Sequence, residues 1–292
     1  MADDAPALQR PMGLRLATLA CALAVVALVG IRALNGANVF PPVPKDATLA
    51  PRLATERSDV REVRIPAGDG IELYGWVQGP DSAPRKIIQF MGNAEYVGPS
   101  AALYAQTAAQ LNAQFLLFDY RGFANSAGKT TEHGLYSDAD AAWTFATGTL
   151  GWKPSQITLW GRSLGGGPAT WLAARQLKAG AAPAALILES PFASIPAMAR
   201  ELMPWLIKPE WLCYSLFDNI GRAPELKLPV FQFHGEHDEI IPFGQGQQLH
   251  GALPGPKRWL ALNCGHNNIW DDSGRASSIR AAMAEFLAEH GA

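Results

Sequence analysis

The sequence predicts an α/β fold, with a mostly parallel sheet of about eight strands and helices on both of its faces. Three observations support this prediction. Short apolar runs alternate with stretches of helical pattern along most of the chain. One of these runs leads through a glycine-flanked serine, Ser163, directly into an alanine-rich helical stretch. Two late apolar runs each open into a polar loop, as parallel strands do at their carboxyl ends.

The individual elements follow from the same alternation, in chain order. Val60 to Ile65 and Ile71 to Val77 flank the turn-forming residues 66–70, so the first two strands are expected to form an antiparallel hairpin. The pattern then predicts strand 86–90, helix 99–112, strand 115–119, helix 136–148, strand 157–160, helix 164–178 and strand 184–189. Strand 230–234, helix 244–252, strand 258–262 and a helix near 275–289 complete the series. Because 48% of the 292 residues are hydrophobic, residues 58–292 can bury one large core and are expected to form one domain.

Residues 1–36 are expected to anchor the chain to a membrane. Leu16 to Ile31 is an uncharged apolar run of 16 residues. Arg15 and Arg32 could snorkel to the interfaces and extend this run towards the roughly 20 residues of a full span. A cleaved signal peptide is the alternative, although no small-x-small cleavage site follows the run. The pattern therefore favours a single uncleaved signal anchor.

Charge predicts the side of the membrane on which the domain lies. Arg10 and Arg15 precede the apolar run and favour a cytoplasmic N terminus, although basic residues after the run weaken this asymmetry. The domain would then lie outside the cytoplasm, in the periplasm if the source is bacterial.

The proline-rich residues 37–57 are predicted to be an extended tether between anchor and domain.

Composition excludes several classes of partner. A net charge of −2 with 17% charged residues gives no basic surface for nucleic acid. The sequence has no P-loop, no dinucleotide-binding fingerprint and no Cys/His spacing typical of zinc sites, so neither a cofactor nor a metal is expected. Cys213 and Cys264 could pair in an oxidising compartment or remain as thiols.

Ser163 lies in the pattern of a nucleophile elbow, a sharp turn between a strand and a helix. Gly161 and Gly165 stand two residues before and after it, where side chains would collide across the turn. The turn exposes the Ser163 hydroxyl and directs the Leu164 N–H to the same place, next to the positive end of the helix. Ser163 is therefore the predicted nucleophile.

A serine nucleophile needs a base and an orienting acid, and both are present in the expected order. Asp238 follows the predicted strand 230–234, and His266 follows the predicted strand 258–262. Both residues therefore lie at the carboxyl ends of strands, the edge of the sheet at which Ser163 emerges. His266 is the predicted general base and acid, and Asp238 the orienting carboxylate.

Neighbouring residues compete for these roles. Glu236 and Glu239 could replace Asp238 as the acid, or could be ordinary loop charges. His234 and His237 could act as bases, but both precede the acid in chain order. His234 is instead expected to form a hydrogen bond with loop backbone at the end of its strand.

The insertion at about residues 192–228 has no strand pattern and is rich in large apolar residues. Because it follows the sixth strand, it is predicted to be a short lid over the active site. Trp205 and Trp211 are the candidate walls of an acyl-chain pocket. The alternative is that the apolar residues only pack the insertion onto the body of the domain.

Several sequence blocks carry a resemblance to a known family. They are 119–126 (Asp-Tyr-Arg-Gly-Phe-Ala-Asn-Ser), 132–140, 189–192 (Glu-Ser-Pro-Phe), 217–220 (Phe-Asp-Asn-Ile) and 234–238 (His-Gly-Glu-His-Asp). With these blocks, residues 58–290 resemble the α/β-hydrolase-fold serine hydrolases. The specific resemblance is to the small membrane-anchored branch, which includes the mammalian depalmitoylating α/β-hydrolase-domain proteins and the fungal bud-emergence-type proteins.

This resemblance implies the α/β-hydrolase fold with a short lid after the sixth strand. It also implies a serine hydrolase that cleaves carboxylic ester or thioester bonds of acyl substrates through an acyl-enzyme intermediate. An amidase or peptidase would use the same triad. A catalytically silent binding or scaffold protein is the third possibility, because a fold does not establish an activity.

The third strand ends in one departure from the family pattern. Met91 stands before Gly92, where relatives usually have a histidine that braces the following loop. That loop is expected to supply the second oxyanion-hole donor, from the backbone N–H of Asn93 or Ala94, beside the Leu164 N–H. The change at residue 91 affects the expected rigidity of the loop, unless Met91 only fills an apolar gap.

Overall fold

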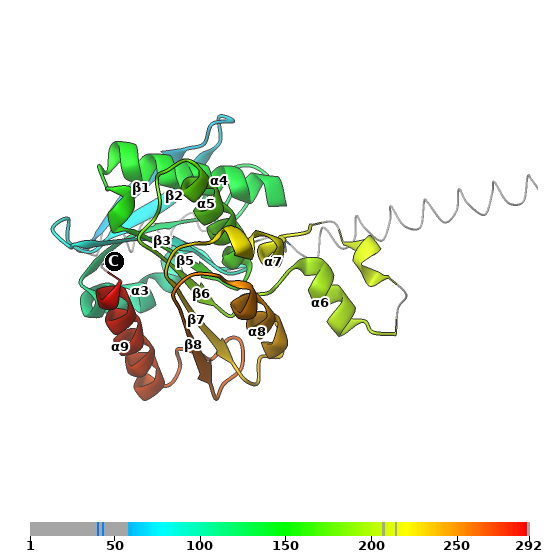
Figure 1. Cartoon of the computed structure of the whole chain (residues 1–292). Helices are drawn as coiled ribbons and strands as arrows, with labels where there is room; N and C mark the ends of the chain where they lie inside the picture. Colours follow the sequence, from blue (N-terminus) through cyan, green and yellow to red (C-terminus); the bar gives the residue numbers. More distant parts are fainter. Residues whose placement is uncertain (1–39, 41–42, 44–57, 206–207, 214, 291–292) are drawn as a thin grey trace, which may run out of the picture.

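The structure is a computed structural model that describes residues 40, 43, 58–205, 208–213 and 215–290 (Figure 1). The predicted anchor, residues 1–36, and all of the tether except Phe40 and Val43 lie outside these residues. In the part of the chain that is described, no helix has the length and apolar character needed to cross a membrane.

Eight strands form one sheet, as the sequence predicts. They are β1 (Val60–Pro66), β2 (Glu72–Gln78), β3 (Arg85–Phe90), β4 (Ala113–Phe118), β5 (Ile157–Arg162), β6 (Ala185–Glu189), β7 (Val230–Gly235) and β8 (Lys257–Leu262). Their order is β1-β2-β4-β3-β5-β6-β7-β8. β2 pairs antiparallel with β1 and with β4, and all other pairs are parallel. The carboxyl ends of β3, β5, β6, β7 and β8 therefore share one edge of the sheet.

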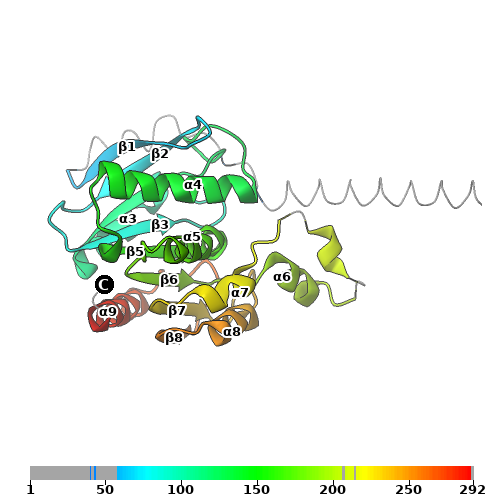
Figure 2. The ribbon, with the colours of Figure 1, turned by 45° about the horizontal axis from the view of Figure 1, so that its top comes forward.

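Helices cover both faces of this sheet (Figures 1 and 2). The α-helices are α3 (Val97–Leu111), α4 (Glu132–Thr144), α5 (Gly166–Lys178), α6 (Ile195–Leu202), α7 (Asn219–Arg222), α8 (Phe243–Ala252) and α9 (Ser273–Glu289). α3 and α9 pack on one face, whereas α4, α5 and α8 pack on the other. This layering confirms the predicted α/β-hydrolase architecture.

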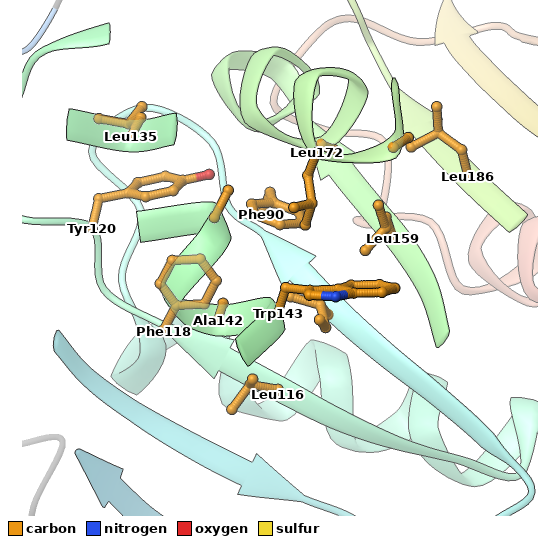
Figure 3. Close-up of a cluster of buried hydrophobic side chains, with 14 of the residues drawn as sticks. Phe90, Leu116, Phe118, Tyr120, Leu135, Ala142, Trp143, Leu159, Leu172 and Leu186 are labelled. Carbon is orange, nitrogen blue, oxygen red and sulfur yellow. The ribbon is translucent and has the colours of Figure 1, made fainter. Parts of the chain in front are cut away.

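Side-chain alternation divides the core into two apolar layers. Along β4, Leu116 and Phe118 point to the α4–α5 side, and Phe115 and Leu117 point to the α3–α9 side. Figure 3 shows the first layer, in which side chains of α4 and α5 meet those of the central strands. The labelled members are Phe90, Leu116, Phe118, Tyr120, Leu135, Ala142, Trp143, Leu159, Leu172 and Leu186.

Local capping residues define several helix ends. Thr131 and Asp272 cap α4 and α9, each accepting a hydrogen bond from the N–H three residues later. Asn112 caps the C-terminal end of α3, where it adopts a left-handed conformation with φ of 48°. These signals are local, which is why element bounds could be predicted to within a few residues.

The segment between β6 and β7 contains α6, the 3₁₀ turn Pro209–Leu212 and α7. Its base is fixed to the body: the Glu132 carboxylate accepts hydrogen bonds from the Leu216 and Phe217 N–H groups at 2.7 and 2.9 Å. Phe40 packs edge-on against Phe217, with ring centroids 6.2 Å apart. In both views of the ribbon, α6 stands clear of the sheet (Figures 1 and 2).

A buried ion pair stabilises the loop that follows β4. The Arg121 Nε donates to Asp138 Oδ1 at 2.7 Å, and the Arg121 backbone N–H donates to Asp138 Oδ2 at 2.9 Å. The Asp138 carboxylate is fully buried, and the Arg121 side chain is 7% exposed. Arg121 also pairs with the partly exposed Asp69, so loss of Asp138 would leave the buried guanidinium with this partner alone, and loss of Arg121 would leave Asp138 buried without its cation.

We expect Asp138→Ala to lower the free energy of unfolding by about 3–5 kcal/mol, because it leaves the Arg121 guanidinium buried with one fewer partner. Asp140→Ala on the same helix is the matched control. Its partner Arg175 is largely exposed, so we expect a loss below about 1 kcal/mol. Urea denaturation of both variants measures the difference, and equal losses would contradict this account of the ion pair.

Candidate active site

Ser163 occupies a strained turn between β5 and α5. Its φ is +50°, in the left-handed region that residues other than glycine rarely adopt. A Cβ at Gly161 would lie 2.6 Å from the Gly165 oxygen, and a Cβ at Gly165 would lie 2.0 Å from the Phe90 oxygen. The two glycines are therefore required by close backbone contacts, as the elbow pattern predicts.

The structure brings the three predicted catalytic residues together at the carboxyl edge. His266 Nε2 lies 3.0 Å from Ser163 Oγ, and His266 Nδ1 lies 2.6 Å from Asp238 Oδ2. A carboxylate only accepts hydrogen bonds, so Nδ1 carries the imidazole proton. Nε2 is then left to accept a hydrogen bond from the Ser163 hydroxyl.

A second histidine also contacts the acid of this triad. His234 is fully buried at the end of β7, and its Nε2 lies 2.9 Å from the Ile241 oxygen and 3.1 Å from Asp238 Oδ2. The contact with loop backbone agrees with the prediction, whereas the contact with Asp238 was not anticipated. Asp238 Oδ1 accepts two further bonds, from the N–H groups of Ile240 and Ile241. The carboxylate is thus fixed from both sides.

These hydrogen bonds determine the charge of Asp238. Burial alone raises the pKa of Asp238, but the hydrogen bonds from His234 and His266 outweigh burial and hold this pKa well below its usual range. A lowered pKa means that the carboxylate stabilises the folded state at every pH above the ordinary value of about 4. This contribution is lost as the pH falls from there through the folded-state pKa.

The competing residues lie elsewhere around the triad. Glu239 Oε2 accepts a hydrogen bond from the His266 backbone N–H at 3.2 Å, so this residue contacts the histidine loop and not the imidazole. Glu236 and His237 are exposed.

Cys213 and Cys264 are both buried, and no disulfide joins them. In the described part of the chain, no group of three or more His, Cys, Asp or Glu side chains could hold a metal ion.

The loop after β3 is braced without the family's histidine. Met91 is fully buried and packs into the apolar layer under α3, so it fills a gap in the core. The brace comes from Glu95, whose Oε2 accepts a hydrogen bond from the Gly92 N–H at 2.6 Å. Tyr120 adds a second tie, because its hydroxyl donates to the Met91 oxygen at 3.2 Å.

The predicted oxyanion-hole residues are neighbours in this arrangement. Leu164 follows Ser163 in the first turn after β5, and Asn93 and Ala94 lie in the loop after β3, the strand paired with β5. Ala94 has a φ of +61°, which marks a tight turn at this position. The Gly92 N–H is engaged by Glu95, and the donor role of Asn93 or Ala94 remains a prediction.

Three charged residues link the loops around Ser163, and the sequence analysis did not assign them a role. Arg162 forms an ion pair with Glu95 in the β3 loop, and its Nε lies 3.0 Å from Glu189 Oε1 at the end of β6. Glu189 is fully buried and also accepts hydrogen bonds from the indoles of Trp160 and Trp270 at 3.2 and 2.7 Å. Burial raises the pKa of Glu189, against the opposing effect of Arg162 and the indoles.

This network connects the loop after β3, the elbow and the loop that carries His266. Arg162 and Glu189 are directly opposite each other in the parallel register of β5 and β6. The sequence did contain a signal for it: Arg162 and Glu189 are the last residues of apolar strands, Glu95 lies in the loop after another, and such ends share one edge of the sheet. Their pairing could not be predicted without the strand order.

The two tryptophans that were predicted to line an acyl-chain pocket are exposed in the structure. Trp205 and Trp211 are 78% and 61% exposed, so they do not form the walls of a closed pocket in this conformation. The alternative, that the apolar residues of the insertion pack onto the body, fits Phe192 and Phe217, which are buried. It does not fit the two tryptophans.

Comparison with known proteins agrees with this geometry. The family model described as "Serine aminopeptidase, S33", an α/β-hydrolase model, matches residues 82–220. The chain is 32% identical over 252 residues to the Mycobacterium tuberculosis protein Rv2307c, covering 85% of this chain and 84% of that protein. It is also 33% identical over 195 residues to human alpha/beta hydrolase domain-containing protein 17B, covering 66% of this chain and 64% of that protein.

The chain belongs to the α/β-hydrolase family. Solved structures agree in fold. The Pyrococcus furiosus esterase Pf2001 aligns with a TM-score of 0.63 at 20% identity, covering 86% of this chain and 98% of the esterase. An alpha-beta hydrolase from Vibrio vulnificus aligns with a TM-score of 0.69 at 18% identity, covering 85% of this chain and 92% of that hydrolase.

The elbow of this α/β hydrolase gives a sharp test of packing. We expect Gly165→Ala to destabilise the fold by about 2 kcal/mol or more, because the new methyl group would meet the Phe90 carbonyl. Gly166→Ala is the matched control, since its Cβ would meet atoms no closer than 3.7 Å. Because residue 166 begins α5, Gly166→Ala should leave the free energy of unfolding unchanged or raise it by about 0.5–1 kcal/mol. Thermal denaturation of both variants would contradict the account if their midpoints were the same.

The charged network of this α/β hydrolase gives a kinetic test. We expect Arg162→Gln to slow fluorophosphonate labelling of Ser163 about tenfold or more, because the β3 loop loses its tie to the elbow and the predicted oxyanion donor of this loop shifts. Arg162→Lys should restore part of the rate, since it keeps the charge but not the fork of donors. Arg175→Gln, an exposed arginine on α5, is the control. Unchanged labelling by folded Arg162→Gln protein would show that the network does not position the site.

Proposed function

We propose that this α/β hydrolase cleaves carboxylic ester or thioester bonds of acyl substrates through Ser163, His266 and Asp238. One observation carries the proposal: the continuous chain of hydrogen bonds from Asp238 through His266 to a serine held at φ of +50°. A structural serine would not require a left-handed turn beside a correctly oriented imidazole.

The chemistry follows from the positions of the three side chains. Ser163 Oγ attacks the substrate carbonyl carbon while His266 Nε2 takes the hydroxyl proton. Asp238 keeps the imidazole in the required tautomer and stabilises the imidazolium that forms. His266 then gives the proton to the departing alcohol or thiol. In the second half of the reaction, His266 activates a water molecule, which releases the acid and restores Ser163.

The negative charge on the carbonyl oxygen needs donors at each tetrahedral stage. The Leu164 N–H, next to the N-terminal end of α5, is the first. The second comes from the β3 loop, at Asn93 or Ala94. Glu95 and Arg162 support this loop from the elbow side, so the donors and the nucleophile keep their relative positions.

The matched family model favours one alternative reaction, because its description names an aminopeptidase. Peptide hydrolysis would use the same triad and the same oxyanion donors. The difference lies in the leaving group, since an amine must be protonated as it departs.

We further propose that residues 1–36 anchor the protein in a membrane, with the hydrolase domain outside the cytoplasm.

The test is hydrolysis of a p-nitrophenyl ester series, from acetate to palmitate, by the full chain in detergent micelles. We expect Ser163→Ala and His266→Ala each to lower kcat/KM by about 10⁴-fold or more, and Ser278→Ala, an exposed serine on α9, to leave it unchanged. Aminoacyl p-nitroanilides form a parallel series. Turnover of the anilides and not the esters would favour the peptidase. No turnover, together with no fluorophosphonate labelling of folded protein, would favour a silent scaffold.

A further inference from the structure

The large exposed apolar side chains of the described residues lie in two segments that leave one edge of the sheet. These five residues are Leu202, Trp205, Trp211, Leu216 and Ile240. Four lie in the segment after β6 and the fifth lies two residues after Asp238, in the loop after β7. Both segments leave the carboxyl edge of the sheet, where Ser163 and His266 lie. Exposed apolar residues gathered in this way mark a surface that contacts another apolar phase or partner.

The composition of this edge favours a lipid interface over a protein partner. Trp205 and Trp211 are 78% and 61% exposed, and indoles favour the boundary between water and hydrocarbon. Lys208 lies over the ring of Trp211 at 4.8 Å from its centroid, and Arg200, whose side chain is 57% exposed, forms an ion pair with Glu210 at 3.8 Å. Cations beside interfacial aromatic residues can contact lipid phosphates while their stems lie along apolar surface.

Phe40, the first residue that the structure describes, lies at the same edge. Phe40 packs on Phe217, next to Leu216 at the base of the lid. The apolar run Leu16–Ile31 ends nine residues before Phe40. Nine residues span at most about 30 Å when fully extended. If this run enters a bilayer, as proposed above, the bilayer surface lies within about that distance of Phe40, which contacts Phe217 at the base of the lid.

From these observations we propose that the carboxyl edge of the sheet is a membrane-docking face, in which Trp205 and Trp211 insert into the lipid interface. The lid then lies on the bilayer rather than over a water-filled cleft, and the edge that carries Ser163 faces the lipid. An acyl substrate could move from the bilayer to Ser163 without crossing water. The docking face rests on the proposed anchor but not on the proposed reaction.

The experiment uses the full chain reconstituted in phosphatidylcholine vesicles with and without brominated acyl chains, which quench only indoles that contact them. Residues 1–39 contain no tryptophan, so the anchor adds no signal of its own. We expect brominated lipid to reduce tryptophan emission, and this reduction to shrink at least threefold in the Trp205→Phe/Trp211→Phe variant. Trp171→Phe is the matched control, because Trp171 is half-buried against Tyr136 at a ring distance of 4.8 Å.

Flotation of the vesicles in a density gradient separates the two proposals. A chain that floats but shows no bromolipid quenching keeps the anchor and overturns the docking face. Quenching of both indoles by aqueous iodide in the floating protein would overturn it as well. Protection from iodide that depends on protein concentration and not on lipid would assign the face to a second copy of the chain. A chain that does not float overturns both proposals.

Discussion

The contact between Gly165 and the Phe90 carbonyl is the constraint on which the site depends. It draws the first turn of α5 against the end of β3, which leaves no room for a Cβ at residue 165. Closing the turn so tightly forces Ser163 into a left-handed conformation. The parallel pairing of β3 and β5 then places the elbow beside the loop that is expected to complete the oxyanion hole. One backbone contact therefore sets the position of the predicted nucleophile and its electrostatic surroundings.

Around this turn, an ionic network braces the β3 loop, in which Met91 stands where relatives usually have a bracing histidine. Three ionic side chains, Glu95, Arg162 and Glu189, are mostly or fully buried, and each is paired within the group. Such pairs contribute little net stability, because burial of the ions offsets their attraction. Their value lies in geometry, since each pair fixes one loop relative to another. His234 has a similar effect on Asp238, because it contacts the same carboxylate oxygen as His266.

Several features of the described residues lie together at the carboxyl edge of the sheet. It carries Ser163, His266 and Asp238, the ionic network and all the exposed large apolar side chains of the described residues. Parallel strands explain the concentration, because every loop that follows a parallel strand leaves at the same edge. Only loops can vary in length and polarity without disturbing the two core layers. A catalytic edge that also contacts lipid would need no additional domain.

The sequence by itself determined the fold class, the element order and the identities of Ser163, Asp238 and His266 as the residues to bring together. These predictions rest on local signals: strand and helix periodicity, glycine spacing, and polar loops after apolar strands. Only the tertiary structure decided that Glu95 braces the β3 loop, that His234 binds Asp238, and that the lid tryptophans face outwards. The physical reason is that strand order and lid orientation depend on packing between segments far apart in the chain. Local sequence patterns do not show which charged side chains form ion pairs across neighbouring strands.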